Sequence, residues 1–549
     1  MKRNMILAGM ACLTLLNSCT AFLEEDLKSS LAPENTYTST LGFEVGSAGL
    51  YSIARSEYNT WGEEGAFIHN GACPYEALQV GTDICLARNG GDGSLIPFSQ
   101  LTLNSSTQFV KTYWQWAYNL IGSANELLKF AQTNTNWDYP TDQALYQAEA
   151  RFFRAYAYRY LVYLYGDVPW VETIQYPFVL SFTRTPKAEV LANIIKDFEF
   201  AADNLPDNPD KVKQGKLTCW AAYHYLSEMY LLQKDYGKAR DAALAVIESG
   251  YYSLTKEHYG LNAKGEFPGD PFSDMFIENN QNRDKGNKEA IWVMQFQYEY
   301  NKAGGGTPSD DWTRRAWNPM YFGITGFTLS SEYGGRGLAQ ILPMKWWIGT
   351  KGTNATGATP EGIFEEGDMR NSEYNIKREW LYNNTEEKSL YGKKCNITDA
   401  TWSAGQLFPA LTKFFYGVDA NLSLTGSYRD RMRIRLPETY FLLAEAYLGL
   451  QDPAKAADAV NVVRRRAKVS DVSPEEMDMD FLLDERIREL VGEEVRRFTL
   501  LRTGTLIDRV KRYNDEQKDI IKETFLLWPI PQTIIDANRD VEFPQNPGY

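Results

Sequence analysis

Hydrophobic and polar positions alternate with helical spacing along seven long segments of the chain. In each segment, aromatic and aliphatic residues recur every three or four positions, which places them on one buried face of an α-helix. The predicted helices are residues 111–131, 143–165, 187–204, 217–233, 236–249, 438–449 and 453–467. The pattern therefore predicts a mostly α-helical fold.

The predicted helices form pairs that share a pattern. The first helix of three pairs ends in a Tyr-Leu step, which begins at Tyr163, Tyr230 or Tyr447, and a turn follows. The second helices carry small residues at helical spacing, such as Ala239 and Ala456. Large rings facing alanines let antiparallel helices pack closely, and the pattern is similar to tetratricopeptide repeats, which stack into a solenoid with one continuous core. An irregular helical bundle is the alternative.

Residues 255–436 interrupt the helical pattern. Residues 300–402 alone contain fourteen of the forty-one glycines and six of the fourteen tryptophans. Loops on a rigid scaffold often carry binding sites, and an aromatic ring can stack on the apolar face of a sugar while polar side chains bind its hydroxyl groups. We therefore expect a large loop-rich insert with few strands that bears the ligand site.

Three stretches supply the candidate ligand-binding residues. The leading patch, in residues 310–323, consists of Trp312, Arg314, Arg315, Trp317, Asn318 and Tyr321. A second candidate is the pair Trp346 and Trp347, of which only one can face a ligand if the segment is extended. The early loops, residues 57–106, add Trp61, Asp83, Arg88 and Asn89. Because tryptophan is usually well buried, core packing is the alternative for each ring, and a fall in thermal midpoint on Trp317→Ala would indicate it.

The N-terminus has the pattern of an export signal. Lys2 and Arg3 precede an apolar run, residues 5–16, which is shorter than the ~20 residues that a membrane-spanning helix needs. The run ends at Leu16-Asn17-Ser18-Cys19, which resembles a bacterial lipobox. Cys19 is then the acylated N-terminus of the mature protein, and two or three acyl chains hold a protein firmly on a membrane.

The chain is therefore predicted to have three parts. Residues 1–18 form a lipoprotein signal peptide, residues 19–40 a lipidated flexible tether, and residues 41–549 a single domain with the insert at about 255–436. A secreted protein whose signal contains Cys19 by chance is the alternative.

The charge and the histidines exclude several classes of function. The formal charge of −14 becomes −16 when Lys2 and Arg3 leave with the signal, which argues against a nucleic-acid partner. The three histidines, His69, His224 and His258, do not have metal-ligand spacing, and nucleotide-binding or hydrolase motifs are missing. His224 is expected in the core, and the other two in loops without partners. We predict no catalytic residue, no metal and no cofactor, although a pair of carboxylates brought together by folding would escape this reading.

Four cysteines remain in the predicted domain. Only Cys73 and Cys85 are close in the sequence. In an exported protein they could form a disulfide, and a pair of buried free thiols is an equally good interpretation.

Several motifs in a fixed order resemble one known family. They include YWQWAYNLIGSANELL, AEARFFRAYAYRYLVYLYGDVPWV, LPETYFLLAEAYLGL, LDERIRELVGEEVRRFTLLR and the closing QNPGY. Together they resemble the SusD/RagB family of outer-membrane nutrient-binding lipoproteins over nearly the whole chain after Cys19. The resemblance implies four tetratricopeptide-like units and a ligand site to which the early loops contribute.

The resemblance also implies a function. Members of the family sit on the outer face of the outer membrane, bind a nutrient that is usually a glycan, and deliver it to a SusC-like TonB-dependent barrel. The acidic residues Glu24, Glu25 and Asp26 resemble the signal that sends such lipoproteins of Bacteroidota to the cell exterior. We therefore expect a non-catalytic, lipid-anchored protein that captures oligosaccharides.

Three other functions remain open at this point. A RagB-like protein with the same transporter would capture peptides, and fewer aromatic platforms would be expected in its site. A surface glycoside hydrolase would cleave the glycan. A tetratricopeptide adaptor would bind a protein partner in its groove.

Overall fold

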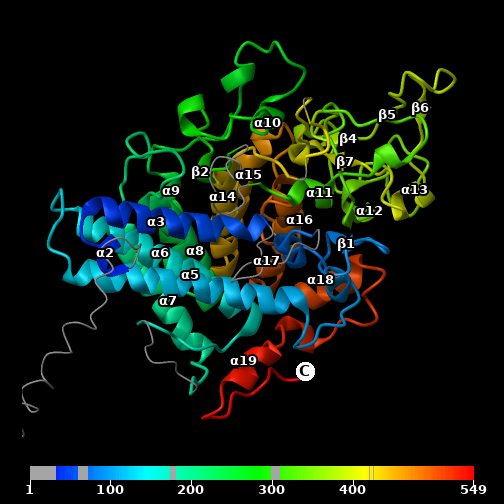
Figure 1. Cartoon of the computed structure of the whole chain (residues 1–549). Coiled ribbons are helices and arrows are strands. Elements are labelled where there is room, and N and C mark those ends of the chain that lie inside the picture. The colour runs from blue at the N-terminus through cyan, green and yellow to red at the C-terminus, as the bar shows by residue number, and fades with distance from the viewer. Residues whose placement is uncertain (1–32, 60–71, 174–180, 298–309, 420, 425) are drawn as a thin grey trace, which may run out of the picture.

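The computed structural model describes residues 33–59, 72–173, 181–297, 310–419, 421–424 and 426–549, and its fold is mostly helical, as predicted (Figure 1). The long helices are α3 (Thr40–Arg55), α5 (Gln108–Thr133), α6 (Asp142–Tyr165), α7 (Lys187–Asn204), α8 (Cys219–Gln233), α9 (Tyr236–Ile247), α14 (Leu436–Gly449), α15 (Pro453–Arg466) and α16 (Met479–Leu490). The end of the chain adds α17 (Arg496–Arg502), α18 (Leu506–Tyr513) and α19 (Gln532–Ala537). All seven helices predicted from the pattern are present.

The long helices pack in the order of the chain. Helix α5 packs on α6, α6 on α7, α7 on α8 and α8 on α9, and α9 then packs on α14, which packs on α15. Helices α9 and α14 are in contact although the whole insert separates them in the sequence. The helical stack is therefore continuous in space but not along the chain. This stack confirms the tetratricopeptide-like scaffold.

The turns inside two of the pairs have the same geometry. Lys234 and Gln451 both adopt a left-handed backbone conformation, with φ of 65° and 61°. The carboxylate of the next residue, Asp235 or Asp452, then accepts a hydrogen bond of 3.1 Å from the main-chain N–H three positions later. An aspartate at this position caps the following helix. The common turn is physical evidence that the two pairs are repeats of one unit.

Alanine and glycine allow the helices of the stack to approach closely. Ala239 and Ala456 are fully buried. A Cβ atom on Gly449 would lie 2.3 Å from the ring of Tyr236, which is closer than two carbon atoms can approach. Phe198 fills the space between α6 and α8, with ring centroids 5.4 Å from Phe152 and 5.5 Å from Tyr225.

The predicted tether and the structure differ at its end. Residues 33–36 form the short helix α2 (Pro33–Thr36), and the ring of Tyr37 stacks on Phe130 with centroids 5.3 Å apart. Residues 33–40 therefore belong to the packed body, because Tyr37 supplies an apolar ring that the helices cover. Cys19 and the predicted signal lie outside the described residues.

The insert contains little regular structure, as predicted. The described residues form four two-stranded antiparallel sheets, which pair β1 (Cys85–Ala87) with β3 (Ile341–Pro343), β2 (Ala290–Met294) with β8 (Arg431–Arg435), β4 (Ile376–Lys377) with β7 (Ala410–Leu411), and β5 (Trp380–Leu381) with β6 (Lys394–Cys395). The β2–β8 pair joins the beginning of the insert to its end, with Val293 opposite Met432. The β1–β3 pair ties an early loop to the middle of the insert.

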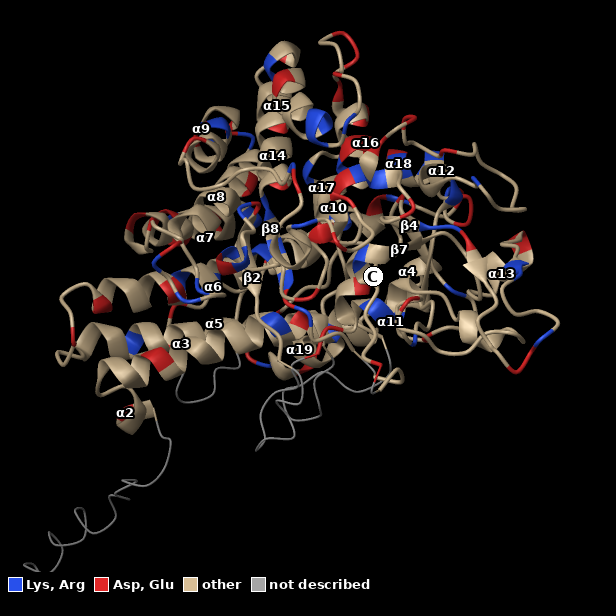
Figure 2. Cartoon of the chain, turned by 90° about the horizontal axis from the view of Figure 1, so that it is seen from above, with Lys and Arg blue, Asp and Glu red and all other residues tan. Residues whose placement is uncertain are grey.

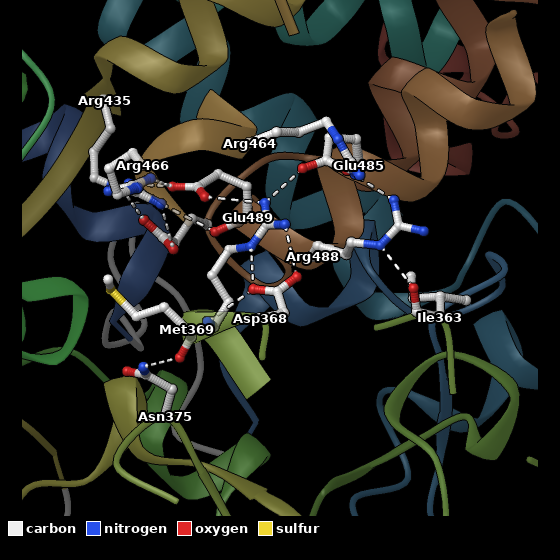
Figure 3. Close-up of polar contacts among 12 residues, drawn as sticks. Ile363, Asp368, Met369, Asn375, Arg435, Arg464, Arg466, Glu485, Arg488 and Glu489 are labelled. Atoms are coloured by element: carbon white, nitrogen blue, oxygen red, sulfur yellow. Dashed lines mark hydrogen bonds and ion pairs between the residues drawn. The ribbon is translucent and has the colours of Figure 1, made fainter. Parts of the chain in front are cut away.

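A mostly buried ionic network fastens the insert to the last repeat helices (Figure 3). Its six cations are Arg370, Lys413, Arg435, Arg464, Arg466 and Arg488, and its six carboxylates are Glu289, Glu365, Asp368, Glu485, Glu489 and Glu493. The Arg370 guanidinium, for example, lies 2.8 Å from Asp368 in the insert and 2.7 Å from Glu485 in α16. Burial by itself raises the pKa of Glu485, but the arginines around it outweigh that effect and lower the pKa to about 2.

Figure 2 shows basic and acidic residues close together near α16, the helix that supplies Glu485, Arg488 and Glu489 to this network. Equal numbers of opposite charges make the network close to neutral. In the part of the chain that the structure describes, no helix is both long enough and apolar enough to cross a bilayer.

The cysteines and histidines resolve two of the alternatives. Cys73 and Cys85 are free and fully buried, so the interpretation as buried thiols is correct. His224 is buried in α8, where burial lowers its pKa to about 3. The expectation that His258 has no partner is wrong, because its Nδ1 lies 2.7 Å from the buried carboxylate of Asp274. His69 lies outside the described residues.

Candidate functional site

The three stretches singled out in the sequence meet in one region of the structure. The main-chain N–H of Arg88, just after β1, donates to the carbonyl of Gln340, just before β3, over 2.9 Å. The N–H of Ala339 donates to the carbonyl of Asn318 over 2.9 Å, at the end of the short helix α11 (Thr313–Trp317). The early loop, the leading patch and β3 are therefore neighbours, although Arg88 and Asn318 are far apart in the sequence.

Most of the candidate residues nevertheless lie in the interior, which corrects the expectation that they face a ligand. The buried candidates are Asp83, Trp312, Arg314, Trp317, Asn318, Tyr321 and Trp347. A large ring gains more from complete burial than from exposure on a loop, and the buried tryptophans of the insert join the hydrophobic core that the helices form. Spacing along a loop could not distinguish these two outcomes.

Several polar atoms of these side chains bind the main chain around them. Trp347 Nε1 donates to the carbonyl of Ile84 over 2.7 Å, and the hydroxyl of Tyr321 donates to the carbonyl of Gly335 over 3.1 Å. The ring of Trp317 stacks on Phe414, with centroids 5.3 Å apart and planes inclined by 15°. These contacts hold the loops of the insert together and leave no face of these rings for a ligand.

Asp83 holds the early loop to the C-terminal helices. Its carboxylate accepts hydrogen bonds of 2.7 Å from Arg496 and 2.9 Å from Arg509. Burial would raise the pKa of Asp83, but the two guanidiniums dominate and lower it to about 2. The role of Asp83 in this structure is that of a buried counter-ion.

Trp346 is the partly exposed member of the tryptophan pair. The pair lies in the short helix α12 (Lys345–Ile348) and not in an extended strand. The ring of Trp346 stacks on Tyr513 with centroids 3.9 Å apart, and its Nε1 donates to the carbonyl of Asp83 over 2.6 Å. One face of Trp346 is therefore covered by α18.

Four polar side chains remain accessible where the three stretches meet. They are Arg88, Asn89, Arg315 and Arg336, and we call them the arginine rim. Asn89 is exposed, and the three arginines are half-buried. Arg315 belonged to the leading patch, whereas Arg336 was missed because it stands alone between glycines, without a neighbouring aromatic residue.

Contacts with buried groups hold two arginines of the arginine rim in place. The Arg315 guanidinium lies over the ring of Trp312, 4.3 Å from its centroid. Burial and the positive charge of Arg336 lower the pKa of Arg315. Arg88 Nε donates to the carbonyl of Ala339 over 2.9 Å. Gly405 is required beside it, because a Cβ there would lie 2.4 Å from Arg88 Cδ.

Trp61 lies outside the described residues, but Asn59, which precedes its segment, lies next to the leading patch. Asn59 Nδ2 donates to Asp310 Oδ1 over 3.1 Å, and the other oxygen of Asp310 accepts from Trp312 Nε1 over 2.8 Å. Asn59 and Asp310 thus lie together beside the ring of Trp312, over which the Arg315 guanidinium lies.

The chemistry of the rim is that of a binding surface. Guanidinium and amide groups donate hydrogen bonds to hydroxyl, carbonyl or carboxylate oxygens. Among the described residues, no group of three or more His, Cys, Asp or Glu side chains is arranged to hold a metal ion.

Two family models match long parts of the chain. The model described as "SusD family" matches residues 288–549, and the model described as "Starch-binding associating with outer membrane" matches residues 95–231. The first covers the insert from β2 onward and all later helices. The second covers the first repeat helices.

Individual proteins are similar over nearly their whole length. The SusD-like protein P25 of Formosa agariphila is 25% identical over 521 residues, which are 90% of this chain and 88% of that protein. The starch-binding protein SusD of Bacteroides thetaiotaomicron is 24% identical over 507 residues, which are 86% of this chain and 85% of that protein.

A solved structure has the same fold. The surface glycan-binding protein A from Bacteroides thetaiotaomicron, in complex with laminarihexaose, matches with a TM-score of 0.68 and 17% identity, and the match covers 92% of this chain and 98% of that one. The helical stack, the insert and the two family models lead to one conclusion: the chain belongs to the SusD/RagB family.

Proposed function

We propose that this protein captures glycans at the outer face of the outer membrane and delivers them uncleaved to a SusC-like TonB-dependent barrel. Family membership supports the proposal, as does the association with the outer membrane in the description of one family model. A starch-binding relative and a similarly folded protein with bound laminarihexaose support carbohydrate as the class of ligand.

The observation that carries the proposal is the arginine rim. Arg88, Asn89 and Arg315 come from two distant stretches of the chain and lie at one edge of the insert, on a frame fixed by buried contacts. A sugar presents many hydroxyl groups, and planar guanidinium groups suit their oxygens because each offers several fixed donors. A rigid rim binds without first being ordered, which lowers the entropic cost of binding.

The anchor and the transporter are parts of the same proposal. Acylation of Cys19 would hold the protein on the membrane, and the residues between Cys19 and α2 would leave the rim free to approach a barrel. The proposal assigns no catalytic step, because a capture protein needs only to bind and release.

Peptide capture is the second candidate, and one observation favours keeping it. The fewer aromatic platforms expected of a RagB-like site agree with the burial of Trp312, Trp317 and Trp347. Guanidinium groups also bind the carbonyl and carboxylate oxygens of peptides.

The test compares ligands and products in one experiment. The purified protein is titrated by calorimetry with maltohexaose, laminarihexaose and a mixture of hexapeptides, and each sample is then analysed by chromatography. We expect heat from an oligosaccharide and an unchanged oligosaccharide afterwards. Heat from peptides alone would favour peptide capture over glycan capture as the function. Shorter sugar products would contradict a non-catalytic role.

A further inference from the structure

A small cavity with many charged residues lies next to α11, and residues of α11, η8 (Thr412–Phe414) and β8 line it. Its volume is about 40 Å³. A water molecule needs roughly 10–15 Å³ measured in this way, so the cavity has room for a few water-sized groups but not for a sugar ring. The charged residues that line it are Asp311, Arg314, Lys413, Arg429, Asp430, Arg431 and Glu493.

Two of the four cations around the cavity have carboxylate partners. Arg431 lies 2.9 Å from Asp311, and Lys413 lies 2.7 Å from Glu493. Glu493 is shared, because Arg435 also lies 2.6 Å from it. These carboxylates are therefore already used by the cations nearest to them.

The third carboxylate, Asp430, is turned to other groups. Its oxygens accept hydrogen bonds from the main-chain N–H of Phe296, over 2.8 Å, and from Asn282 Nδ2, over 2.5 Å. Burial raises the pKa of Asp430. It forms no ion pair with either of the two remaining arginines.

Arg314 and Arg429 bind only main-chain carbonyl groups. Arg314 donates to the carbonyls of Tyr416, over 2.7 Å, and Leu424. Arg429 donates to the carbonyls of Phe276, over 2.5 Å, and Phe415, over 3.2 Å, and also to that of Lys413. Within the described ranges, neither guanidinium lies within ion-pair distance of a carboxylate.

This arrangement differs from the neighbouring ionic network. There, each arginine lies within ion-pair distance of at least one carboxylate. Arg314 is buried and Arg429 is half-buried. A charge removed from water without a counter-ion is costly, and carbonyl dipoles compensate it only in part. The Nε atom of Arg314 is also buried and has no acceptor among the described residues.

We propose that the cavity behind α11 binds a small monovalent anion, of the size of a halide or a formate ion, between Arg314 and Arg429. The anion would supply the missing counter-charge, and the volume of the cavity suits an ion close to water in size. Burial lowers the pKa of both arginines to about 10, so both remain protonated at neutral pH. The site is separate from the arginine rim and does not depend on the nature of the nutrient.

The anion would join parts of the insert that are distant in sequence. Arg314 belongs to α11, whereas Arg429 binds carbonyls within and just after η8 (Thr412–Phe414) and at Phe276. Neutralising both arginines at one point therefore stabilises the insert as a unit. The expected consequence is a thermal midpoint that depends on the kind of anion present.

The test measures the thermal midpoint of the purified protein by calorimetry at constant ionic strength. Sodium gluconate, whose anion is too large for the cavity, is replaced stepwise by sodium chloride or, in a second series, by sodium formate. We expect the midpoint to rise and saturate in at least one series. A midpoint that stays constant in both series would overturn the proposal.

Three variants identify the site. Arg314→Met and Arg429→Met are each expected to weaken the apparent anion affinity by about ten-fold or more, the loss that follows from removing one charge-assisted contact. Arg315→Met removes the same charge from the same helix but does not line the cavity, so the response should persist. An unchanged response in both cavity variants would overturn the assignment.

Diffraction gives an answer even where a variant fails to fold. Crystals of the unaltered protein grown with bromide in place of chloride should show an anomalous peak in contact with both guanidiniums. Bromide peaks elsewhere, with water alone in this cavity, would contradict the proposal.

Discussion

The helical stack and the insert are built from the same residue types but held together in different ways. In the stack, rings on one helix meet alanines on the next, and neighbours in space are mostly neighbours in sequence. In the insert, tryptophans donate to main-chain carbonyls of distant loops, and arginines bind carboxylates of helices that follow much later. Local periodicity therefore describes the stack, whereas the insert depends on partners that no local pattern reveals.

The largest expected effect comes from comparing two consecutive arginines, one buried in the ionic network and one on the surface. Arg466 is fully buried and binds Glu289, at 3.1 Å, and Glu489, so Arg466→Met leaves two carboxylates undercompensated. We expect the free energy of unfolding to fall by about 3–5 kcal/mol. Urea unfolding followed by circular dichroism measures it.

The adjacent residue is the matched control. Arg465 is exposed and pairs with Asp471 on the surface, so Arg465→Met should leave the unfolding midpoint unchanged. Equal losses in the two variants would show that the network does not fasten the insert to the helices.

A tryptophan of the insert provides the second test. Trp317 is 2% exposed and stacks on Phe414. Trp317→Ala should lower the free energy of unfolding by about 3–5 kcal/mol, because it leaves a cavity the size of an indole ring. Tyr391→Ala is the control, since Tyr391 is 55% exposed. If Trp317→Ala weakened glycan binding while the thermal midpoint stayed constant, Trp317 would belong to the ligand site after all.

The border between the two regions gives a smaller, pH-dependent effect. Glu76 lies in η2 (Pro74–Leu78), which contacts both α5 and α11, and its fully buried carboxylate lies near Arg431 and Trp317, which lower its pKa less than burial raises it. Burial raises the pKa of Glu76 from 4.5 to about 8. A raised pKa favours the protonated folded form. The contribution of Glu76 to the stability of the fold is therefore complete below pH 4.5 and is lost as the pH rises toward 8.

Glu76→Gln removes this dependence because the amide does not ionise. The variant should be more stable than the unaltered protein at pH 8, by on the order of 2 kcal/mol, and equally stable at pH 4. Unfolding in urea at several pH values measures the difference. A constant difference across the pH range would show that Glu76 does not titrate on folding.

The bounds of the helices were largely predictable, and the outcome at the tryptophans was not. Residues 187–204 were predicted as a helix with the bounds that α7 has, because apolar spacing and a preceding proline define it locally. Whether Trp347 faces a ligand depends on Ile84, whose carbonyl accepts its N–H from 263 positions away. The same holds for Asp83, whose counter-ion Arg496 is 413 positions later.

The three candidate stretches lie together in the structure, but only some of their side chains reach the surface. Early loop, patch and β3 do converge, yet Arg315 is accessible whereas Arg314 is buried. A five-residue helix turns consecutive side chains to different sides, so the choice between the two depended on the direction of α11. Sequence alone contains no signal for that direction.

The most direct measurement is the affinity of the arginine rim for an oligosaccharide. Calorimetry with the hexasaccharide that binds best would compare the unaltered protein with Arg315→Ala and with the distant surface variant Arg465→Ala. We predict that Arg315→Ala weakens binding by about ten-fold with little change in thermal midpoint, while Arg465→Ala binds normally. Undiminished binding by Arg315→Ala would contradict the account.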